Sequence, residues 1–244
     1  MQLFRIKMNL KHNYWYFDSV LTNRFCDEVI RYANEKQEIT ALVGSKEKIK
    51  NKITEILKKF PEDIKLSQEE LIKKHNIKVN NKLNDEELLD LKKQRDSNIV
   101  WLSEAWIYKE IQPYIHIANK NSNWNFDWNY SEACQFTKYK LNQHYDWHCD
   151  SWEEPYVSND PKFNGRIRKL SVTCSLSDPK DYKGGEFEIS HRNNLKDDQP
   201  SICNEIKNKG SIIVFPSFLW HRVRPVTEGT RYSLVIWNLG YPFR

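Results

Sequence analysis

From Trp124 to its end the chain consists of short apolar segments separated by turn residues, and this pattern limits the fold more than any other feature. The segments are rich in aromatic and β-branched residues, which favour strands. Asp178-Pro179, Gly184-Gly185 and Glu228-Gly229 indicate turns between them. Many short strands at such spacing are typical of a sandwich or a barrel. Strands are predicted at 133–140, 145–150, 169–176, 186–189, 211–215, 223–226 and 232–238.

Helices are predicted on the N-terminal side of this region. Thr22 or Asn23 can cap a helix whose inward positions follow helical spacing. These inward positions are Phe25, Val29 and Tyr32, with Cys26 beside them. A second helix is predicted over 104–118, with an interruption near Pro113 because proline lacks the backbone donor.

Residues 34–94 differ in composition from both flanks and are rich in Lys, Glu, Asn and Ile. An amphipathic helix is predicted from Ile49 to Phe60, where Pro61 stops it. A capping box at 67–70 predicts a second helix, and 85–93, with acids first and bases last, predicts a third. We therefore expect a core segment at 1–33, a helical insertion at 34–94 and the main domain at 95–244.

The bulk composition narrows the classes of protein. At 39% hydrophobic residues the chain can build a core, and a net charge of +5 does not call for nucleic acid as a partner. Five cysteines without a CxxC pair favour a reducing compartment over a disulfide framework. The N-terminus has no signal-like apolar run and no stretch is long enough for a membrane span, so we expect a cytoplasmic protein that needs no membrane.

His148 and Asp150 stand two residues apart in a predicted strand, where positions i and i+2 share a face. A second histidine, His221, ends a later apolar run, and Arg231 follows it by ten residues. Two histidines and one carboxylate on one side of a metal leave the other side open, as in non-haem Fe(II) oxygenases. The planar fork of an arginine can bind an anionic co-substrate through paired hydrogen bonds.

Strand parity alone leaves the metal motif open, because His144 and Asp146 repeat the same spacing on the same face. Cys149 falls on the opposite strand face, which argues against thiolate ligation. The alternation from Arg231 through Ser233 to Trp237 places these three on one face of the last predicted strand. Ser233 can therefore add a hydroxyl donor beside Arg231.

The order of these residues resembles a known family. Tyr139, Tyr145, His148 and Asp150 follow the Y-x5-Y-x2-H-x-D run of prolyl 4-hydroxylase-like (PKHD-type) Fe(II)/2-oxoglutarate dioxygenases. Stretches at 168–171, 176–179, 184–186 and 215–232 are similar as well, so the resemblance covers about 95–240 and leaves out the Lys-rich insertion. Its spacing selects His148 and Asp150 over His144 and Asp146. It implies an α+β fold with a double-stranded β-helix (jelly-roll) core, flanking N-terminal helices and a helical insertion.

The resemblance also implies the roles of the candidate residues. His148, Asp150 and His221 would hold Fe(II), and Arg231 would bind the distal carboxylate of 2-oxoglutarate beside Tyr139. Tyr145 would lie toward the substrate, and Trp237, on the Arg231 face, is assigned to the same side. O₂ is the second co-substrate, and the family resemblance admits ascorbate as an added reductant.

The implied activity is hydroxylation of prolyl residues in a peptide or protein. The alternatives are the same chemistry on a free amino acid, a small metabolite or a nucleobase, and a non-catalytic metal-binding jelly roll. The nucleobase branch usually carries a second arginine six residues after the first, a place that Trp237 holds here. A structural metal site would not need an anion-binding arginine, which argues against the non-catalytic alternative.

Overall fold

The computed structural model describes residues 10–41, 59–60, 62, 74, 91–151, 154–190 and 200–243. The chain divides into two compact units, one made of Met1–Thr40 with Ser97–Arg244 and the other of Ala41–Asp96. The strands that carry the candidate site residues all belong to the first unit.

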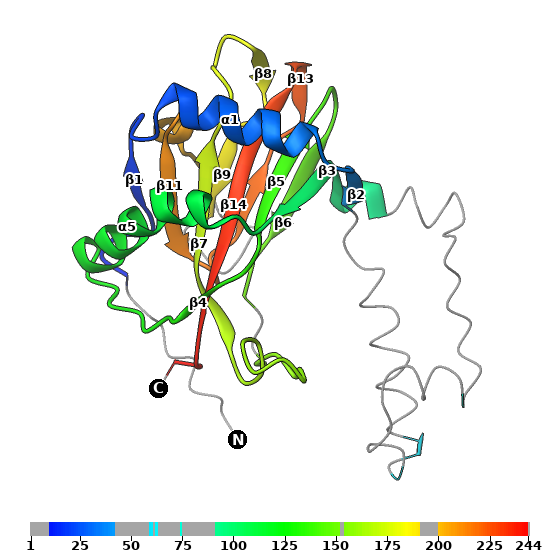
Figure 1. Cartoon of the computed structure of the whole chain (residues 1–244), viewed down its shortest axis with the longest axis vertical. Helices are drawn as coiled ribbons and strands as arrows, with labels where there is room; N and C mark the ends of the chain where they lie inside the picture. The colour runs from blue at the N-terminus through cyan, green and yellow to red at the C-terminus, as the bar shows by residue number, and fades with distance from the viewer. Residues whose placement is uncertain are drawn as a thin grey trace. The chain divides into compact units, whose positions relative to one another are not determined.

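Antiparallel strands make up most of the first unit (Figure 1). In hydrogen-bonded order these are β1 (Trp15–Phe17), β11 (Ile212–Pro216), β7 (Ile167–Ser175), β14 (Arg231–Gly240), β5 (Cys134–Tyr139), β3 (Arg95–Leu102), β6 (His144–His148), β12 (His221–Val223), β9 (Phe187–Ile189) and β10 (Ser201–Ile202). Two short strands, β2 (Ile39–Ala41) and β4 (Tyr130–Ser131), lie off this path, and β8 (Tyr182–Gly184) pairs separately with β13 (Val226–Gly229).

This order has two halves that the chain visits in turn. One half contains β5, β14, β7 and β11, and the other contains β6, β12, β9 and β10. The chain passes from β5 to β6, returns with β7, leaves again for β9 and β10, and then alternates through β11, β12 and β14. Such a curled antiparallel arrangement fits the expected jelly-roll core.

Two helices cover one side of the first half (Figure 1). Helix α1 (Asn23–Asn34) begins as expected, because the Thr22 side chain accepts a hydrogen bond from the Phe25 amide at 3.1 Å. Phe25, Cys26 and Val29 are buried as predicted, and Ala33 completes the inward face, while Tyr32 is half-buried. The start and the inward face of this helix are therefore confirmed.

The interruption predicted near Pro113 is wrong. Helix α5 runs unbroken over Ala105–Asn121 with Pro113 inside it. Pro113 is exposed, whereas Ile107, Ile111 and Ile115 on the opposite face are fully buried. Packing of this apolar stripe offsets the backbone hydrogen bond that proline cannot make.

The main core lies between these helices and the sheet. Phe136 of β5, Val172 of β7 and Leu234 and Ile236 of β14 point to the helix side and are almost completely buried. A second cluster, which includes Tyr139, Phe187 and Phe215, gathers side chains from strands of both halves.

The strand predictions hold for most of the sheet, but two segments have the wrong extent and several strands were not predicted, namely the eight-residue strand β3 and the short β2, β4, β8 and β10. The segment 223–226 spans the gap between β12 and β13, since Arg224 and Pro225 belong to neither strand. The segment 145–150 is too long, because β6 ends at His148. Within 34–94 most of the expected helices lie outside the described residues, although 59, 74 and 91–94 are helical.

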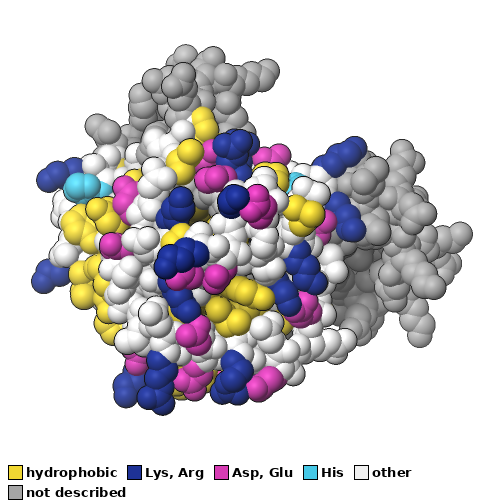
Figure 2. Space-filling model, turned by 90° about the horizontal axis from the view of Figure 1, so that it is seen from above, with side chains coloured by type: hydrophobic (Ala, Val, Ile, Leu, Met, Phe, Trp, Pro, Cys, Tyr) yellow, Lys and Arg dark blue, Asp and Glu magenta, His cyan; other side chains and the backbone are white. Residues whose placement is uncertain are grey.

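Three further properties of the described residues concern expectations from the composition: the state of the cysteines, the length of the helices and the distribution of surface charge. All five cysteines are free, and Cys149 alone among them is not fully buried. No helix in the described part of the chain is long and apolar enough to cross a bilayer. Figure 2 shows basic and acidic side chains interspersed over the face that it presents, without a region of one sign.

Candidate metal centre and anion pocket

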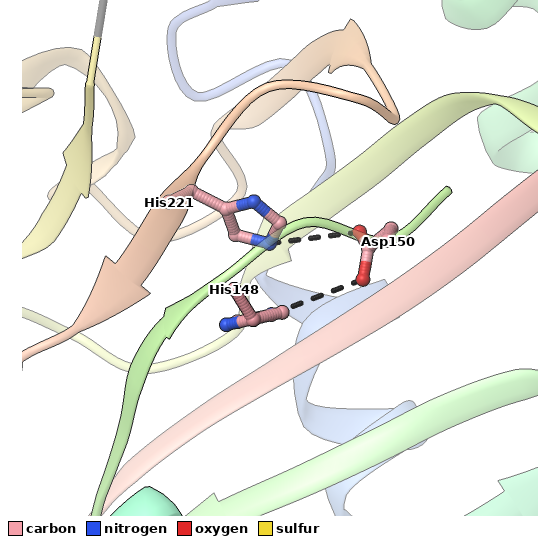
Figure 3. Close-up of side chains that lie close together, drawn as sticks. All are labelled: His148, Asp150 and His221. Carbon is pink, nitrogen blue, oxygen red and sulfur yellow. Dashed lines mark ion pairs between the residues drawn. The ribbon is translucent and has the colours of Figure 1, made fainter. Parts of the chain in front are cut away.

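Two histidines and one aspartate converge between the two halves of the strand order (Figure 3). His148 ends β6, His221 begins the neighbouring β12, and the two are directly paired in register. The Nε2 atoms of His148 and His221 lie 3.8 Å and 3.5 Å from the two carboxylate oxygens of Asp150. The donor atoms of all three lie within 4.8 Å of one another, so one ion can reach all of them after small adjustments.

Both imidazole rings are oriented by backbone carbonyls. The Nδ1 atom of His148 lies 2.7 Å from the Asp146 carbonyl oxygen, and Nδ1 of His221 lies 3.0 Å from that of Leu219. A carbonyl only accepts, so Nδ1 must carry the proton and donate it. This leaves the lone pair on each Nε2, the atom that faces Asp150, which is how ligating histidines are usually held.

Asp150 is positioned by hydrogen bonds and not by the strand alternation expected from the sequence. It lies two residues beyond the end of β6, and its amide donates to the carbonyl of Ser217 at 2.8 Å. The Ser171 hydroxyl donates to the carboxylate at 2.7 Å, and the Ser217 hydroxyl lies 2.9 Å from that of Ser171. The same-face argument therefore does not apply to Asp150, since only His148 of this pair lies in β6, and it was the family spacing that selected the pair.

The electrostatics favour a charged carboxylate at Asp150. Burial is the largest single effect and raises the pKa of this carboxyl group, but His221, His148, Arg168 and the Ser171 hydrogen bond lower it, and together they outweigh burial. The net result is a pKa below the usual value for aspartate. An ionised, buried carboxylate beside two imidazoles is a suitable donor set for a divalent cation.

A bulge in β6 decides which side chains face the centre. Between the pairs His221–His148 and Val223–Tyr145 the register shifts, because three steps along β6 match two along β12. Tyr145 therefore stacks on the His148 ring, with 3.4 Å between ring centroids, although an odd spacing would separate them in a regular strand. His144 and Asp146 are absent from the cluster of possible metal ligands among the described residues.

Arg231, the first residue of β14, lines the same cavity as the His–Asp–His cluster. It is 2% exposed, and its Nη1 atom is buried without a hydrogen-bond partner in the described part of the chain. Its guanidinium carbon lies 5.6 Å from the ring centre of Tyr139, its partner in register on β5. Ser233 follows on the same face of β14, paired with Thr137. An unpaired buried cation of this kind is costly unless an anion binds it.

Ser175 was missed by the sequence analysis. It pairs with Ser233 across β7 and β14, and its hydroxyl is likewise buried without a partner among the described residues. A signal was available, since Ser171, Thr173 and Ser175 alternate with apolar residues along one strand. Such a period of two indicates a polar face that looks away from the helix-side core.

One cavity brings the sequence-derived candidates together. It has a volume of about 30 Å³ and lies where the two halves face each other. Its lining includes His148, Asp150, His221, Arg231, Tyr139, Ser233, Tyr145 and Trp237. A larger cavity of about 380 Å³, beside β8, β10 and the short 3₁₀ helix η2 (Asn204–Ile206), shares only Phe187 and Arg231 with it.

Comparisons with known proteins agree with this geometry. Residues 134–238 match the family model of the 2OG-Fe(II) oxygenase superfamily. A PKHD-type hydroxylase of Pseudoalteromonas atlantica is 35% identical over 105 residues, which are 42% of this chain and 41% of that protein. A PKHD-type hydroxylase of Escherichia coli O157:H7 is 34% identical over 108 residues, or 42% and 40% of the two chains. The match thus spans less than half the length of these curated relatives.

Solved structures share the fold over nearly the whole chain. A viral collagen prolyl hydroxylase from Paramecium bursaria Chlorella virus-1, in complex with 2OG, superposes with a TM-score of 0.53 at 18% identity, covering 94% of this chain and 97% of that one. A prolyl-4-hydroxylase of Pseudomonas putida gives 0.51 at 15% identity, with coverage of 93% and 92%. The matched residues 134–238 contain the His–Asp–His cluster and Arg231, so the similarity to the 2OG-Fe(II) oxygenase superfamily covers the candidate site.

Proposed function

We propose that this protein is an Fe(II)- and 2-oxoglutarate-dependent hydroxylase. The observation that carries the proposal is that an open His–Asp–His cluster shares one cavity with the buried Arg231, whose Nη1 has no hydrogen-bond partner among the described residues. The superfamily match supports it, since that family is defined by Fe(II) and 2-oxoglutarate. We assign the catalytic domain to 95–244 and treat 34–94 as an insertion in it.

The three clustered residues fit the metal. His148 and His221 each present Nε2 because Nδ1 is held by a carbonyl, and Asp150 supplies the anionic oxygen. Bound Fe(II) would supply the oxidative chemistry that couples O₂ and 2-oxoglutarate to hydroxylation of a C–H bond. The contribution of the chain is to orient these donors and to keep water away from them, as the burial of Asp150 and His221 indicates.

The polar groups around Arg231 fit the co-substrate. Arg231 would pair with the distal carboxylate of 2-oxoglutarate, and the hydroxyls of Ser233 and Ser175 lie on the same buried face. Tyr139, 4% exposed, forms the wall beside Arg231. A bound carboxylate would provide the partners that Nη1 of Arg231 and Oγ of Ser175 lack within the described residues.

We further propose that the substrate is a prolyl residue of a peptide or protein. The names of the relatives support this, because the similar structures are prolyl hydroxylases and the curated relatives are PKHD-type hydroxylases. Tyr145 and Trp237, which line the cavity on the metal side, are the candidate walls for the substrate. Both are aromatic surfaces of the kind against which a proline ring packs.

The direct test is detection of succinate formed from 2-oxoglutarate, with Fe(II), O₂ and ascorbate present, by mass spectrometry. Succinate should form slowly alone and faster with proline-containing peptides, and the peptide should gain the mass of one oxygen. Asp150→Ala should remove this activity, whereas His144→Ala should keep it. Absence of Fe(II)-dependent succinate would refute the hydroxylase, and hydroxylation of free amino acids or nucleobases instead of peptides would refute the prolyl substrate.

A further inference from the structure

Phe243 belongs to a cluster of three phenylalanines that joins three separate segments of the chain. Its ring centroid lies 4.8 Å from that of Phe126 and 6.0 Å from that of Phe218, and the latter two centroids lie 6.4 Å apart. Phe126 precedes β4, Phe218 lies between β11 and β12, and Phe243 follows β14. Aromatic rings attract each other at separations of about 4.5–7 Å, so this cluster ties the three segments together.

The Phe243 ring also covers a buried lysine. Nζ of Lys169 lies 3.5 Å from the centre of the ring, and Lys169 is 3% exposed while Phe243 is 40% exposed. Burial lowers the pKa of the Lys169 ammonium group, and a cation removed from water gains most from an aromatic face. The carbonyl of Lys169 accepts a hydrogen bond from the Ser217 amide at 3.0 Å. Phe243 thus packs on the residue that follows Ser217 and on the residue that is bonded to Ser217.

The loop 217–220, between β11 and β12, holds two of the three candidate metal ligands through backbone carbonyls. The Ser217 carbonyl accepts the hydrogen bond from the Asp150 amide at 2.8 Å. The Leu219 carbonyl lies 3.0 Å from Nδ1 of His221 and fixes the orientation of that ring. One residue, the phenylalanine of the cluster, stands between these two carbonyls in the chain. A shift of its side chain would therefore move both supports.

We propose that Phe243 is a positioning residue for the metal centre. Its ring packs on Phe218 and thereby keeps the 217–220 loop in place, and that loop aims two of the ligands at one ion. The proposal rests on the proposed function, since it concerns the same metal site. Phe243 does not line the site cavity and need not touch any ligand of the metal. Residues that support metal ligands in this way usually contribute a factor of about 10–100 to metal affinity.

Tyr241, two residues earlier in the chain, is a matched control. Its ring covers Arg166 much as Phe243 covers Lys169, with 5.2 Å from the guanidinium carbon to the ring centre. Its exposure is similar, at 52%. Among the described residues its ring contact is with Arg166 and not with the 217–220 loop. Tyr241→Ala therefore removes an aromatic ring from the same segment without removing the support of the loop.

The support of the loop can be measured on the full-length protein without metal. Hydrogen exchange of single backbone amides is followed by ¹H–¹⁵N NMR. In Phe243→Ala the Asp150 amide should exchange several-fold faster, because its bond to the Ser217 carbonyl opens more often. The Leu176 amide, bonded to the Tyr232 carbonyl at 3.1 Å, should exchange as in the wild-type protein.

Further variants separate the Phe243 ring from other effects. Phe243→Tyr keeps the ring and should retain wild-type exchange at Asp150. Phe243→Leu should show a smaller increase than Phe243→Ala, and it tests the same contact if the alanine variant folds poorly. Tyr241→Ala should leave the exchange of the Asp150 amide unchanged.

Metal affinity, measured by calorimetry with Co(II), is the second readout. Phe243→Ala should weaken Co(II) binding roughly tenfold, while Tyr241→Ala should stay within about twofold of wild type. Phe218→Ala should cause a loss similar to that of Phe243→Ala. The double variant should lose no more than Phe218→Ala alone, because the two residues act through one contact.

Wild-type exchange at Asp150 or wild-type Co(II) affinity in Phe243→Ala would overturn the proposal. Equal losses in Tyr241→Ala would also overturn it, since they would indicate a general effect of the segment. A wild-type protein that binds no Co(II) would count against the proposed hydroxylase instead. The exchange of the Asp150 amide would still decide in that case whether Phe243 supports the loop.

Discussion

The two faces of β5, β7 and β14 differ more than any other two regions of the protein. On the helix side, Phe136, Val172 and Leu234 are buried in an apolar core. On the opposite side, Thr137, Ser175 and Ser233 of the same strands are just as deeply buried but polar. The same strands thus supply an apolar core from one face and the candidate binding site from the other.

The difference between the two faces indicates the role of the polar face. Burial of polar groups without partners lowers stability, and native structures contain few such groups. Here two of them among the described residues, Nη1 of Arg231 and Oγ of Ser175, occur on the same face of neighbouring strands. Their partners are expected from a ligand, and so substitutions on the two faces should affect different quantities.

The largest effect is expected at the metal ligands. Asp150→Ala should abolish metal binding and turnover, because the cluster loses its only carboxylate. The fold should survive, since the helix-side core is untouched. Metal affinity is measured by calorimetry with Co(II) or Mn(II), and stability by thermal unfolding. His144→Ala is the control with normal binding, and a variant at Asp150 that still binds one metal tightly would break the comparison.

The second-largest effect is expected at Arg231, the candidate partner of the distal carboxylate of 2-oxoglutarate. Arg231→Ala should weaken 2-oxoglutarate binding by about 3–5 kcal/mol, or roughly two to four powers of ten, because the distal carboxylate would lose its buried partner. Arg231→Lys should recover only part, since an ammonium cannot form the paired bonds. A 2-oxoglutarate titration of the anaerobic Fe(II) protein measures this. Wild-type affinity in Arg231→Ala would show that Arg231 does not bind 2-oxoglutarate. The nearby Arg222 and Arg224 each form an ion pair with Glu188.

A helix-side substitution should show the reverse pattern. Phe136→Ala should lower the free energy of unfolding by about 3–5 kcal/mol, as for a large aromatic side chain removed from a packed core. Its 1% exposure places it at the centre of that core. Well below the melting temperature, affinities for metal and 2-oxoglutarate should remain near wild type. Urea unfolding and the same titrations provide the two measurements, and a matching loss of affinity would show that the faces are not independent.

The smallest effect is expected at Ser175, where a substitution should lower the affinity for 2-oxoglutarate without lowering the free energy of unfolding. Ser175→Ala should reduce 2-oxoglutarate affinity by about 0.5–1.5 kcal/mol, the usual contribution of one hydrogen bond. In the ligand-free protein the free energy of unfolding should hold steady or rise, because an unpaired buried hydroxyl is removed. Leu234→Ala, on the other face of the adjacent strand, is the control that should lose stability. A destabilised Ser175→Ala with normal affinity would assign the hydroxyl to the fold.

The sequence predicts the sheet and the candidate residues because both depend on local patterns. Turn pairs and apolar segments indicate most strands, and the spacing around His148 and Arg231 follows a known family. It does not predict that Asp150 lies beyond the strand, because its position depends on Ser171 and Ser217, which are distant in the chain. It also misjudges Pro113, since exposure of that residue follows from tertiary packing. Interactions between distant segments account for each of these errors.

The bulge in β6 changes what a deletion in this strand would do. Deletion of one residue between Tyr145 and His148 would remove the extra residue and let the ladder with β12 become regular. Tyr145 and His148 would then lie two positions apart and still share a face. The same deletion in a regular strand, such as loss of Tyr232 from β14, would instead place Arg231 and Ser233 on opposite faces. A one-residue deletion should therefore be better tolerated at the bulge of β6 than within β14.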